Sequence, residues 1–410
     1  MTTLYSRAVA SLLAALIGLT VQTAAQGTVP KPMVILIGID GFRSDYLARG
    51  HAPNLQRLAA GGARVEELTP VFPSVTFPNH VSIVTGRYPG HHGILNNTMV
   101  DPTITHQVFR LRDRAAVTNP AWWSEAEPIW VTASRQGRVS STLFWPGSEV
   151  LINGIQPRDW LPYQHDLSSR ERAERLLTWL TDIRPDRPQA DFATLYFSDV
   201  DSEGHAHGPD SMQVNQAIER VDAAIGLLIN GLRDAGLWEN TTLVIVSDHG
   251  MSHVPLSQTI DGASLLQNLP NARWEWTGPA PALRLGGESQ EAVLIALSRE
   301  PNLQCWPKAL APKRLGPLEH RRVPDVVCLA RLGWSLSDRR LSFPIPGQHG
   351  FDPDHPEMQG FLIAHGPAIK PVSMGRVPNR EVYLLLCRLL GIEAAAHDAS
   401  GVLAEQMLRH

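Results

Sequence analysis

Side chains that bind metal ions follow three apolar stretches of this 410-residue chain, and a further histidine stands much later. Carboxylates and neutral imidazoles suit Zn²⁺, and a pair of zinc ions can clamp a phosphoryl group between them. The pattern therefore predicts two zinc ions and the hydrolysis of a phosphate ester. We expect one zinc to be held by Asp201, His205 and His349, and the other by Asp40, Asp248 and His249.

Thr76 supplies the hydroxyl that this chemistry needs. It stands in the turn Pro73-Ser74-Val75-Thr76-Phe77-Pro78, and we expect it to contact the zinc held by Asp40. Zinc lowers the pKa of a bound hydroxyl, so that an alkoxide forms near neutral pH. Asn97 is expected to donate a hydrogen bond to another phosphate oxygen, most strongly in the transition state.

Each of these residues also has an ordinary structural explanation. Asp40 and His249 each precede a glycine, as turn residues do, and a threonine near Pro78 often caps a helix. Asn97 follows another asparagine, which is common in loops. The prediction of a metal site therefore depends on the combination. The other histidines near these positions are expected to be solvated or to donate hydrogen bonds to ligands: His80, His91, His92, His207, His253 and His355.

Alternating strands and helices are expected to position these side chains. Residues 33–39, 192–197 and 242–246 are apolar runs without polar alternation, which is typical of parallel strands buried on both faces. Helical patterns separate them at 53–62, 169–181 and 212–232. The order predicts a doubly wound sheet, in which ligands bind beyond the carboxyl ends of the strands.

Thr76 is expected at or just before the start of a short helix, residues 78–85, which ends at Gly86. A helix N-terminus favours negative charge that develops nearby. Residues 255–345 break the regular alternation and carry weaker strand patterns near 282–285 and 325–329. We interpret them as an inserted α+β subregion of one catalytic domain, residues 26–410.

The amino-acid composition indicates which kind of molecule the protein binds. The formal net charge is −4, and no run of Lys and Arg forms a surface for nucleic acid. A small-molecule phosphate substrate is expected instead. Cys305, Cys328 and Cys387 lack the spacing of a thiolate zinc site. In an oxidising compartment, Cys305 and Cys328 can form a disulfide, which leaves Cys387 as a buried free thiol.

Residues 1–25 are typical of a secretory signal peptide. Basic Arg7 precedes the apolar run 8–21, and Thr23-Ala24-Ala25 forms a small-residue cleavage site. The run is short for spanning a bilayer, and the alternative is an uncleaved membrane anchor. No other stretch of the sequence is apolar enough to cross a membrane. We expect a mature chain that is periplasmic or secreted.

Several motifs resemble those of the nucleotide pyrophosphatase/phosphodiesterase family in the alkaline phosphatase superfamily: Ile39-Asp40-Gly41-Phe42-Arg43, Phe72-Pro73-Ser74-Val75-Thr76-Phe77-Pro78-Asn79-His80, Gly86-Arg87-Tyr88-Pro89, Ser247-Asp248-His249-Gly250-Met251 and His349-Gly350-Phe351-Asp352. The resemblance implies an alkaline phosphatase-like α/β fold, mostly parallel, with helices on both faces. It also implies two zinc ions, a phospho-threonine intermediate at Thr76 and phosphate binding by Asn97. Phe77 and Tyr163 would sandwich a nucleobase; the alternative for both aromatic rings is core packing.

The leading hypothesis is a secreted two-zinc phosphodiesterase that cleaves nucleotide diesters or pyrophosphates to nucleoside monophosphates. Two alternatives use the same site: a phosphonoacetate hydrolase and a phosphodiesterase of choline phospholipid headgroups. A sulfatase would need Cys or Ser in place of Thr76. A more remote alternative is a metal-dependent binding protein that has lost catalysis.

Overall fold

A mixed sheet of eight strands forms the centre of the structure, a computed structural model that describes residues 31–339 and 345–409. The predicted signal peptide therefore lies outside the described residues. In spatial order the strands are β18 (Val372–Pro378), β2 (Ala63–Thr69), β17 (Gly360–His365), β8 (Thr241–Val246), β1 (Met33–Ile39), β7 (Phe192–Phe197), β5 (Ser140–Leu143) and β6 (Asp159–Trp160).

The predicted mostly parallel α/β sheet is confirmed, with one exception in strand direction. β1 pairs in parallel with both β7 and β8, and the parallel pairing continues through β5 to β6. β17 runs antiparallel to its neighbours β8 and β2. The apolar pattern of residues 360–364 indicates a buried strand, but burial on both faces does not specify the direction of a strand.

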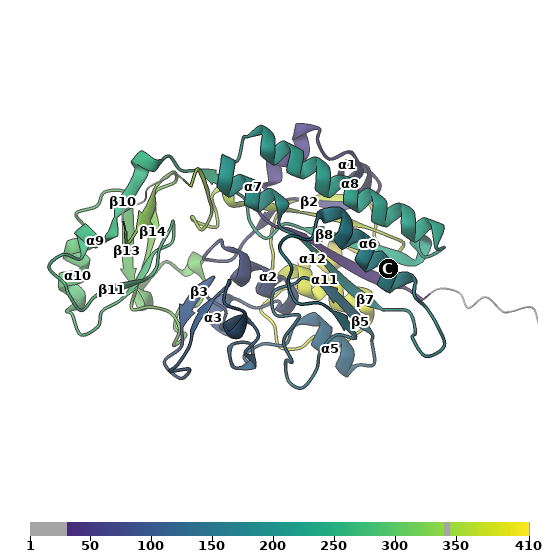
Figure 1. Ribbon diagram of the computed structural model, residues 1–410, viewed down its shortest axis with the longest axis horizontal. Coiled ribbons are helices and arrows are strands. Elements are labelled where there is room, and N and C mark those ends of the chain that lie inside the picture. Colours follow the sequence, from purple (N-terminus) through teal and green to yellow (C-terminus); the bar gives the residue numbers. More distant parts are fainter. Residues whose placement is uncertain (1–30, 340–344, 410) are drawn as a thin grey trace, which may run out of the picture. The chain divides into compact units, whose positions relative to one another are not determined.

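Strand β1 shows why these sequences lack polar alternation. Its odd-numbered residues, such as Ile35 and Ile37, pack in one hydrophobic cluster, and Val34 and Leu36 pack in another. Successive side chains of a strand point to opposite faces, so both faces of the sheet are covered. Figure 1 shows α6 and α8 on one face and α5, α11 and α12 on the other.

Among the helices that supply these clusters, those predicted at 53–62, 78–85, 169–181 and 212–232 begin and end close to the predicted positions. On the first face are α1 (Pro53–Gly61), α6 (Ser169–Thr181) and α8 (Met212–Asp234). On the second are α2 (Thr76–Thr85), α5 (Ile129–Arg135), α11 (Glu381–Leu390) and α12 (Val402–Met407). Helix α6 begins at a capping box, in which Ser168 and Glu171 satisfy each other's backbone N–H groups.

A smaller sheet forms within the segment interpreted as an insertion. It is antiparallel and consists of β11 (Arg273–Trp276), β12 (Ala282–Arg284), β14 (Val326–Ala330) and β13 (Leu303–Pro307). Helices α9 (Gly262–Leu265) and α10 (Gln290–Leu297) accompany it, with a separate hydrophobic cluster. The short strands β10 (Thr259–Asp261) and β15 (Ser335–Ser337) pair beside it.

The cysteines lie as the sequence predicts. Cys305 of β13 and Cys328 of β14 are direct cross-strand partners and form a disulfide, which joins the two strands of the small sheet. Cys387 is a buried free thiol in α11.

Two short strand pairs lie outside the two larger sheets. β16 (Gly347–Gln348) pairs with β9 (Ser252–His253), and β3 (Thr98–Val100) pairs with β4 (Val108–Arg110). Further short helices are α3 (Pro89–His92), α4 (Arg114–Val117) and α7 (Asp199–His207). The loops that carry His349 and Asn97 are therefore anchored by backbone hydrogen bonds.

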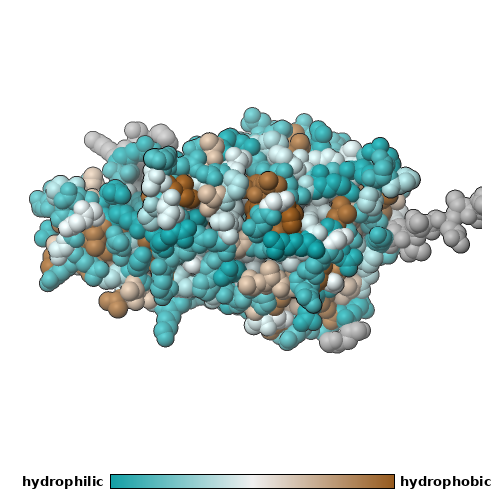
Figure 2. All heavy atoms as spheres, turned by 90° about the horizontal axis from the view of Figure 1, so that it is seen from below, coloured by the Kyte–Doolittle hydropathy of each residue, from teal (hydrophilic) through white to brown (hydrophobic). Residues whose placement is uncertain are grey.

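One face of the molecule can be described by the hydropathy of its surface residues, and it is largely hydrophilic (Figure 2). On the face shown in Figure 2, hydrophobic residues form small separate patches among hydrophilic ones. Within residues 31–339 and 345–409, none of the helices has the length and apolar character needed to span a bilayer.

Candidate active site

Three neighbouring parallel strands end at the same edge of the sheet and deliver three carboxylates there. Asp40 directly follows β1, Asp248 follows β8, and Asp201 lies in the first turn of α7, after β7. Gly41 has a φ of +66°, and a Cβ at this position would come within 2.9 Å of the Asp201 backbone. Only glycine fits this close approach without strain.

The first predicted ligand set is brought together. Asp201 Oδ1 lies 3.5 Å from His205 Nε2 and 3.5 Å from His349 Nε2, and the two Nε2 atoms are 3.1 Å apart. Asp201 and His205 share one face of α7, four residues apart. His349 arrives from the loop after β16. These three residues form one of the groups whose donor atoms lie within 4.8 Å of one another.

The second predicted set also converges. His249 Nε2 lies 3.4 Å from Asp40 Oδ1 and 3.1 Å from Asp248 Oδ2. The two sets are adjacent, because Asp201 also lies within 4.8 Å of donor atoms of Asp40 and His249. All members of this second set are almost fully buried.

Each carboxylate of the second set uses one oxygen within the protein and leaves the other free. Asp40 Oδ2 accepts a hydrogen bond from the Tyr196 hydroxyl at 2.5 Å, and Asp248 Oδ1 accepts one from the Gly41 N–H at 3.2 Å. Asp40 Oδ1 and Asp248 Oδ2 are buried and have no hydrogen-bond partner, and the same holds for Asp201 Oδ1. Such atoms are costly unless something satisfies them.

The three imidazoles follow the same pattern. Nδ1 of His205, His249 and His349 faces the backbone oxygen of Gly347, Gly250 and Ser74, respectively, at 2.8–2.9 Å. A carbonyl oxygen only accepts, so each Nδ1 carries the proton and each neutral ring has its lone pair on Nε2. The facing Nε2 atoms of His205 and His349 then cannot hydrogen-bond to each other.

The pKa values of these carboxyl groups and imidazoles are shifted, because the groups are buried and close together. Burial raises the pKa of all three carboxyl groups, and repulsion from Asp248 raises those of Asp40 and Asp201 further. Burial also lowers the pKa of the three imidazoles. Three carboxylates and three neutral lone pairs therefore converge with no cationic side chain among them. This donor set fits divalent cations, and its nitrogen and oxygen atoms suit zinc.

Two further residues support the site, and of these Tyr196 was not predicted from the sequence. Tyr196 orients Asp40 through a hydrogen bond. The feature that could have identified it is its position in β7, where it pairs with Gly38 of β1. His80 was expected to be solvated or a donor, and it forms a metal-capable group with Asp40 and Asp248. Its Nδ1 lies 2.9 Å from the Thr76 carbonyl oxygen and 3.2 Å from Asp248 Oδ2. Its Nδ1 proton goes to the Thr76 carbonyl oxygen, so His80 ties the start of α2 to the second ligand set while Asp248 Oδ2 stays without a hydrogen bond.

Thr76 is the first residue of α2, as expected. The backbone around it is tied to the first ligand set, because Ser74 O accepts from His349, and it is also tied to His80, which donates to Thr76 O. Asn79 secures the preceding turn: its side chain bonds the Val71 N–H and donates to the Pro73 and Val75 carbonyl oxygens. Thr76 is half-buried and stands at a helix N-terminus, and its carbonyl oxygen accepts from His80, whose Nδ1 lies 3.2 Å from Asp248 Oδ2.

Asn97 lies next to this helix start. Its Oδ1 accepts a hydrogen bond from the Phe77 N–H at 3.0 Å, which assigns Nδ2 to the opposite side of the amide as a donor. Its backbone oxygen accepts from the Leu111 N–H at 2.9 Å. The geometry leaves one amide donor of Asn97 available for an anion near Thr76.

The two aromatic residues occupy different surroundings. The ring of Phe77 packs against Phe109 and Trp123, with centroids 5.7 and 6.2 Å away. Tyr163 is partly exposed, packs edge-on against Phe144 and donates a hydrogen bond to Ser198 Oγ at 3.2 Å. Both have core or rim packing contacts, and a nucleobase sandwich between them stays a prediction.

Known proteins are similar to this chain in sequence and in fold. The model of the family "Type I phosphodiesterase / nucleotide pyrophosphatase" matches residues 34–352. The chain is 36% identical to a bis(5'-adenosyl)-triphosphatase of Xenopus laevis, over 90% of this chain and 80% of the relative. It is also 36% identical to ectonucleotide pyrophosphatase/phosphodiesterase family member 3 of Bos taurus, over 92% of this chain and 45% of that relative.

Solved structures agree. The murine ectonucleotide pyrophosphatase/phosphodiesterase 5, in an inactive threonine-to-alanine form in complex with AMP, aligns with a TM-score of 0.85 and 31% identity over 92% of this chain and 100% of that one. The human protein gives a TM-score of 0.86 and 32% identity, over 92% of this chain and 99% of that one. The chain therefore belongs to the type I phosphodiesterase/nucleotide pyrophosphatase family of hydrolases, in the alkaline phosphatase superfamily.

Proposed function

We propose that the chain is a two-zinc enzyme that hydrolyses nucleotide phosphodiester or pyrophosphate bonds to nucleoside monophosphates, with Thr76 as the nucleophile. The observation that carries the proposal is the set of buried Asp and His atoms without partners beside the start of α2. One zinc would bind Asp201, His205 and His349, and the other Asp40, Asp248 and His249. Bound zinc would lower the pKa of the Thr76 hydroxyl and stabilise charge on the phosphoryl oxygens.

The Thr76 oxygen attacks phosphorus, and the bond to the leaving oxygen breaks as the threonine ester forms. Water then cleaves this ester, which releases the nucleoside monophosphate and restores the hydroxyl. The N-terminus of α2 favours the charge that develops next to Thr76. A threonine-to-alanine form of the murine relative is described as inactive, which supports a catalytic threonine in the family.

Asn97 stabilises the same phosphoryl group. Because Phe77 N–H occupies its Oδ1, the free Nδ2–H is directed to an oxygen of the substrate. Phe77 and Tyr163 are proposed to contact the nucleobase. The AMP complex of the murine relative and the bis(5'-adenosyl)-triphosphatase of Xenopus laevis support a nucleotide with an adenine base as substrate.

Export to the periplasm or the medium is proposed as well. The disulfide between Cys305 and Cys328 supports it, since such bonds persist in oxidising compartments. Intact-mass measurement of the exported protein without reductant should give a chain that begins at Gln26 and carries one disulfide, and alkylation after denaturation should modify one thiol, Cys387. Retention of residues 1–25, or three reactive thiols under denaturing conditions, would contradict this.

A substrate profile tests the reaction class. We expect p-nitrophenyl thymidine monophosphate to be turned over with a higher kcat/KM than p-nitrophenyl phosphate, p-nitrophenyl phosphorylcholine or phosphonoacetate, and bis(5'-adenosyl) triphosphate to release AMP. The reason is that the site offers donors for one phosphoryl group and aromatic rings for a base. Rapid cleavage of phosphonoacetate, with none of the diesters, would show that the carbon–phosphorus alternative is correct.

Replacement of the nucleophile tests the covalent step. The Thr76→Ala variant should lose at least about 10³-fold in kcat, because no other group replaces the hydroxyl. Metal content, measured by atomic emission, should stay near that of the wild type, since Thr76 contributes little to affinity. Thr76→Ser is the matched control and should retain measurable turnover. Equal activity of the alanine and wild-type forms would remove Thr76 from its role.

Chelation tests the metal and gives a pH dependence. In the metal-free protein the carboxyl groups of Asp201 and Asp248 have pKa values raised to about 8 and about 7, chiefly by burial, whereas the unfolded chain releases these protons at about pH 4. The unfolded state binds fewer protons between these values, so the metal-free protein loses stability as the pH rises through this window.

Bound zinc favours the ionised carboxylates and so removes the loss of stability that the metal-free protein shows as the pH rises. The melting temperature of the zinc-loaded protein should therefore exceed that of the chelated protein by a margin that widens between about pH 5 and about pH 8. Turnover should vanish on chelation and return with zinc. A margin that shrinks with rising pH would show that these carboxylates do not bind the cation.

A further inference from the structure

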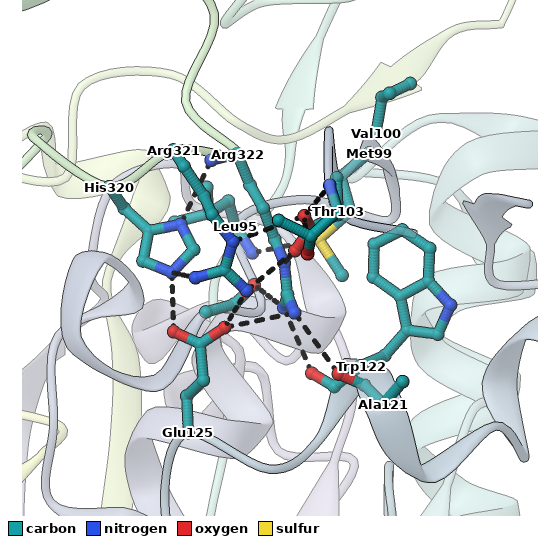
Figure 3. Close-up of polar contacts among 12 residues, drawn as sticks. Leu95, Met99, Val100, Thr103, Ala121, Trp122, Glu125, His320, Arg321 and Arg322 are labelled. Carbon is teal, nitrogen blue, oxygen red and sulfur yellow. Dashed lines mark hydrogen bonds and ion pairs between the residues drawn. The ribbon is translucent and has the colours of Figure 1, made fainter. Parts of the chain in front are cut away.

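A fully buried arginine from the segment between β13 and β14 reaches into the part of the chain that carries Asn97. Arg322 has no solvent-exposed surface, and its neighbours Arg321 and His320 lie at the rim of the same cluster. Figure 3 shows the three side chains directed from one loop toward Glu125, Trp122 and the backbone near Val100. None of them is among the proposed ligands or the nucleophile.

Every polar edge of Arg322 is engaged with residues 93–125. Its Nε donates to Asp101 Oδ2 at 2.5 Å, and Nη1 donates to the carbonyl oxygens of Gly93 and Trp122 at 2.7 and 3.0 Å. The guanidinium also lies over the ring of Trp122, 5.0 Å from its centroid. A planar guanidinium can make this set of contacts at once, whereas an ammonium group cannot.

Asp101 is the matching anion and is equally buried. Burial alone would raise its pKa, but hydrogen bonds from Thr103, Arg322 and Arg321 outweigh burial and hold the pKa below the usual range. Asp101 therefore stays ionised at neutral pH. The buried pair persists only because both charges are paired and hydrogen-bonded.

The two anchor points of Arg322 bracket Asn97 in the sequence. Gly93 lies four residues before Asn97 and Asp101 four residues after it, and β3 runs between Asn97 and Asp101. The same inserted segment makes a third contact here, because Glu275 Oε1 accepts the Val100 N–H at 3.1 Å. Arg284 links the contacts: it pairs with Glu275 at 2.7 Å and donates to the Arg322 carbonyl oxygen at 2.9 Å.

We propose that Arg322, through Asp101 and Gly93, is a positioning residue that sets the place of the Asn97 amide against the phosphoryl group. The inserted segment thereby controls catalysis without touching the substrate. The inference rests on the proposed role of Asn97. If these contacts had only a structural role, breaking any one of them would lower the stability of the protein to a similar extent. A positioning residue instead changes kcat, and it does so through Asn97 in particular.

Arg322→Lys is the principal test, since it keeps the charge but cannot reach Asp101 and both carbonyl oxygens together. With p-nitrophenyl thymidine monophosphate, kcat should fall roughly tenfold to hundredfold with KM changed far less, because a small misplacement of a catalytic donor is costly. Arg187→Lys is the matched control: this partly buried arginine pairs with Asp159 at the far edge of the sheet, and kcat should stay within about twofold.

A double-mutant cycle separates positioning from folding. Asn97→Ala should itself lower kcat by about 10²–10³. In that background, Arg322→Lys should lower kcat further by less than about twofold, because the group that it positions is gone. Full multiplication of the two effects, or an unchanged kcat in Arg322→Lys, would overturn the inference. If Asn97→Ala leaves kcat unchanged, the proposed role of Asn97 fails instead.

Glu275 gives a second route that does not disturb the buried charge pair. Glu275→Gln keeps an oxygen for the Val100 N–H, and Glu275→Leu removes it. The leucine variant should lower kcat, and the glutamine variant should restore most of it at similar melting temperature. Equal kcat values for the two variants would show that the contact does not position Asn97.

Discussion

Three carboxyl groups and three imidazoles, of the kinds that can bind metal ions, converge in a site where nothing in the described protein neutralises them. Asp40, Asp201 and Asp248 are crowded together, each with a buried oxygen that lacks a partner. The imidazoles beside them donate their Nδ1 protons to backbone carbonyl oxygens, so the lone pair of each ring is on Nε2. Such an arrangement opposes folding, because buried like charges repel and burial removes their hydration. The packing of the rigid sheet edge must offset this cost, and the cations proposed to bind there would reduce it.

The parallel sheet explains how residues so far apart in sequence meet. β7, β1 and β8 are adjacent and in register, so their carboxyl ends lie level and their first polar residues share one edge. His349 reaches that edge by another route. Its loop follows β16, which pairs with β9, and β9 lies just after Asp248 and His249. Gly347 approaches so closely that a Cβ there would come within 2.0 Å of the Gly204 carbonyl oxygen, which sets His349 against His205.

Much of this could be predicted from the sequence, because the strands buried on both faces and the capped helices carry strong local patterns. Helix α6 begins and ends where its apolar period and capping box place it. The direction of β17 and the partner of Asp40 could not be predicted. Strand direction depends on long-range pairing, and the Tyr196 hydroxyl meets Asp40 only once β7 lies beside β1. Helix α7 was also missed, although Asp201 and His205 stand at helical spacing.

Arg322 illustrates a second limit of sequence reasoning. Nothing in the local pattern of residues 318–325 marks an arginine that is fully buried, because burial here comes from packing against residues 93–125. A buried ion pair adds little net stability compared with apolar side chains, but it fixes geometry, since both charges demand defined partners. The proposed role of Asn97 needs that definition: its amide would have to present Nδ2 rather than Oδ1 to a phosphate, and Phe77 N–H selects this orientation only if the loop is in place. Contacts from the segment between β13 and β14 to both flanks of Asn97 would hold its amide donor in place without touching the substrate.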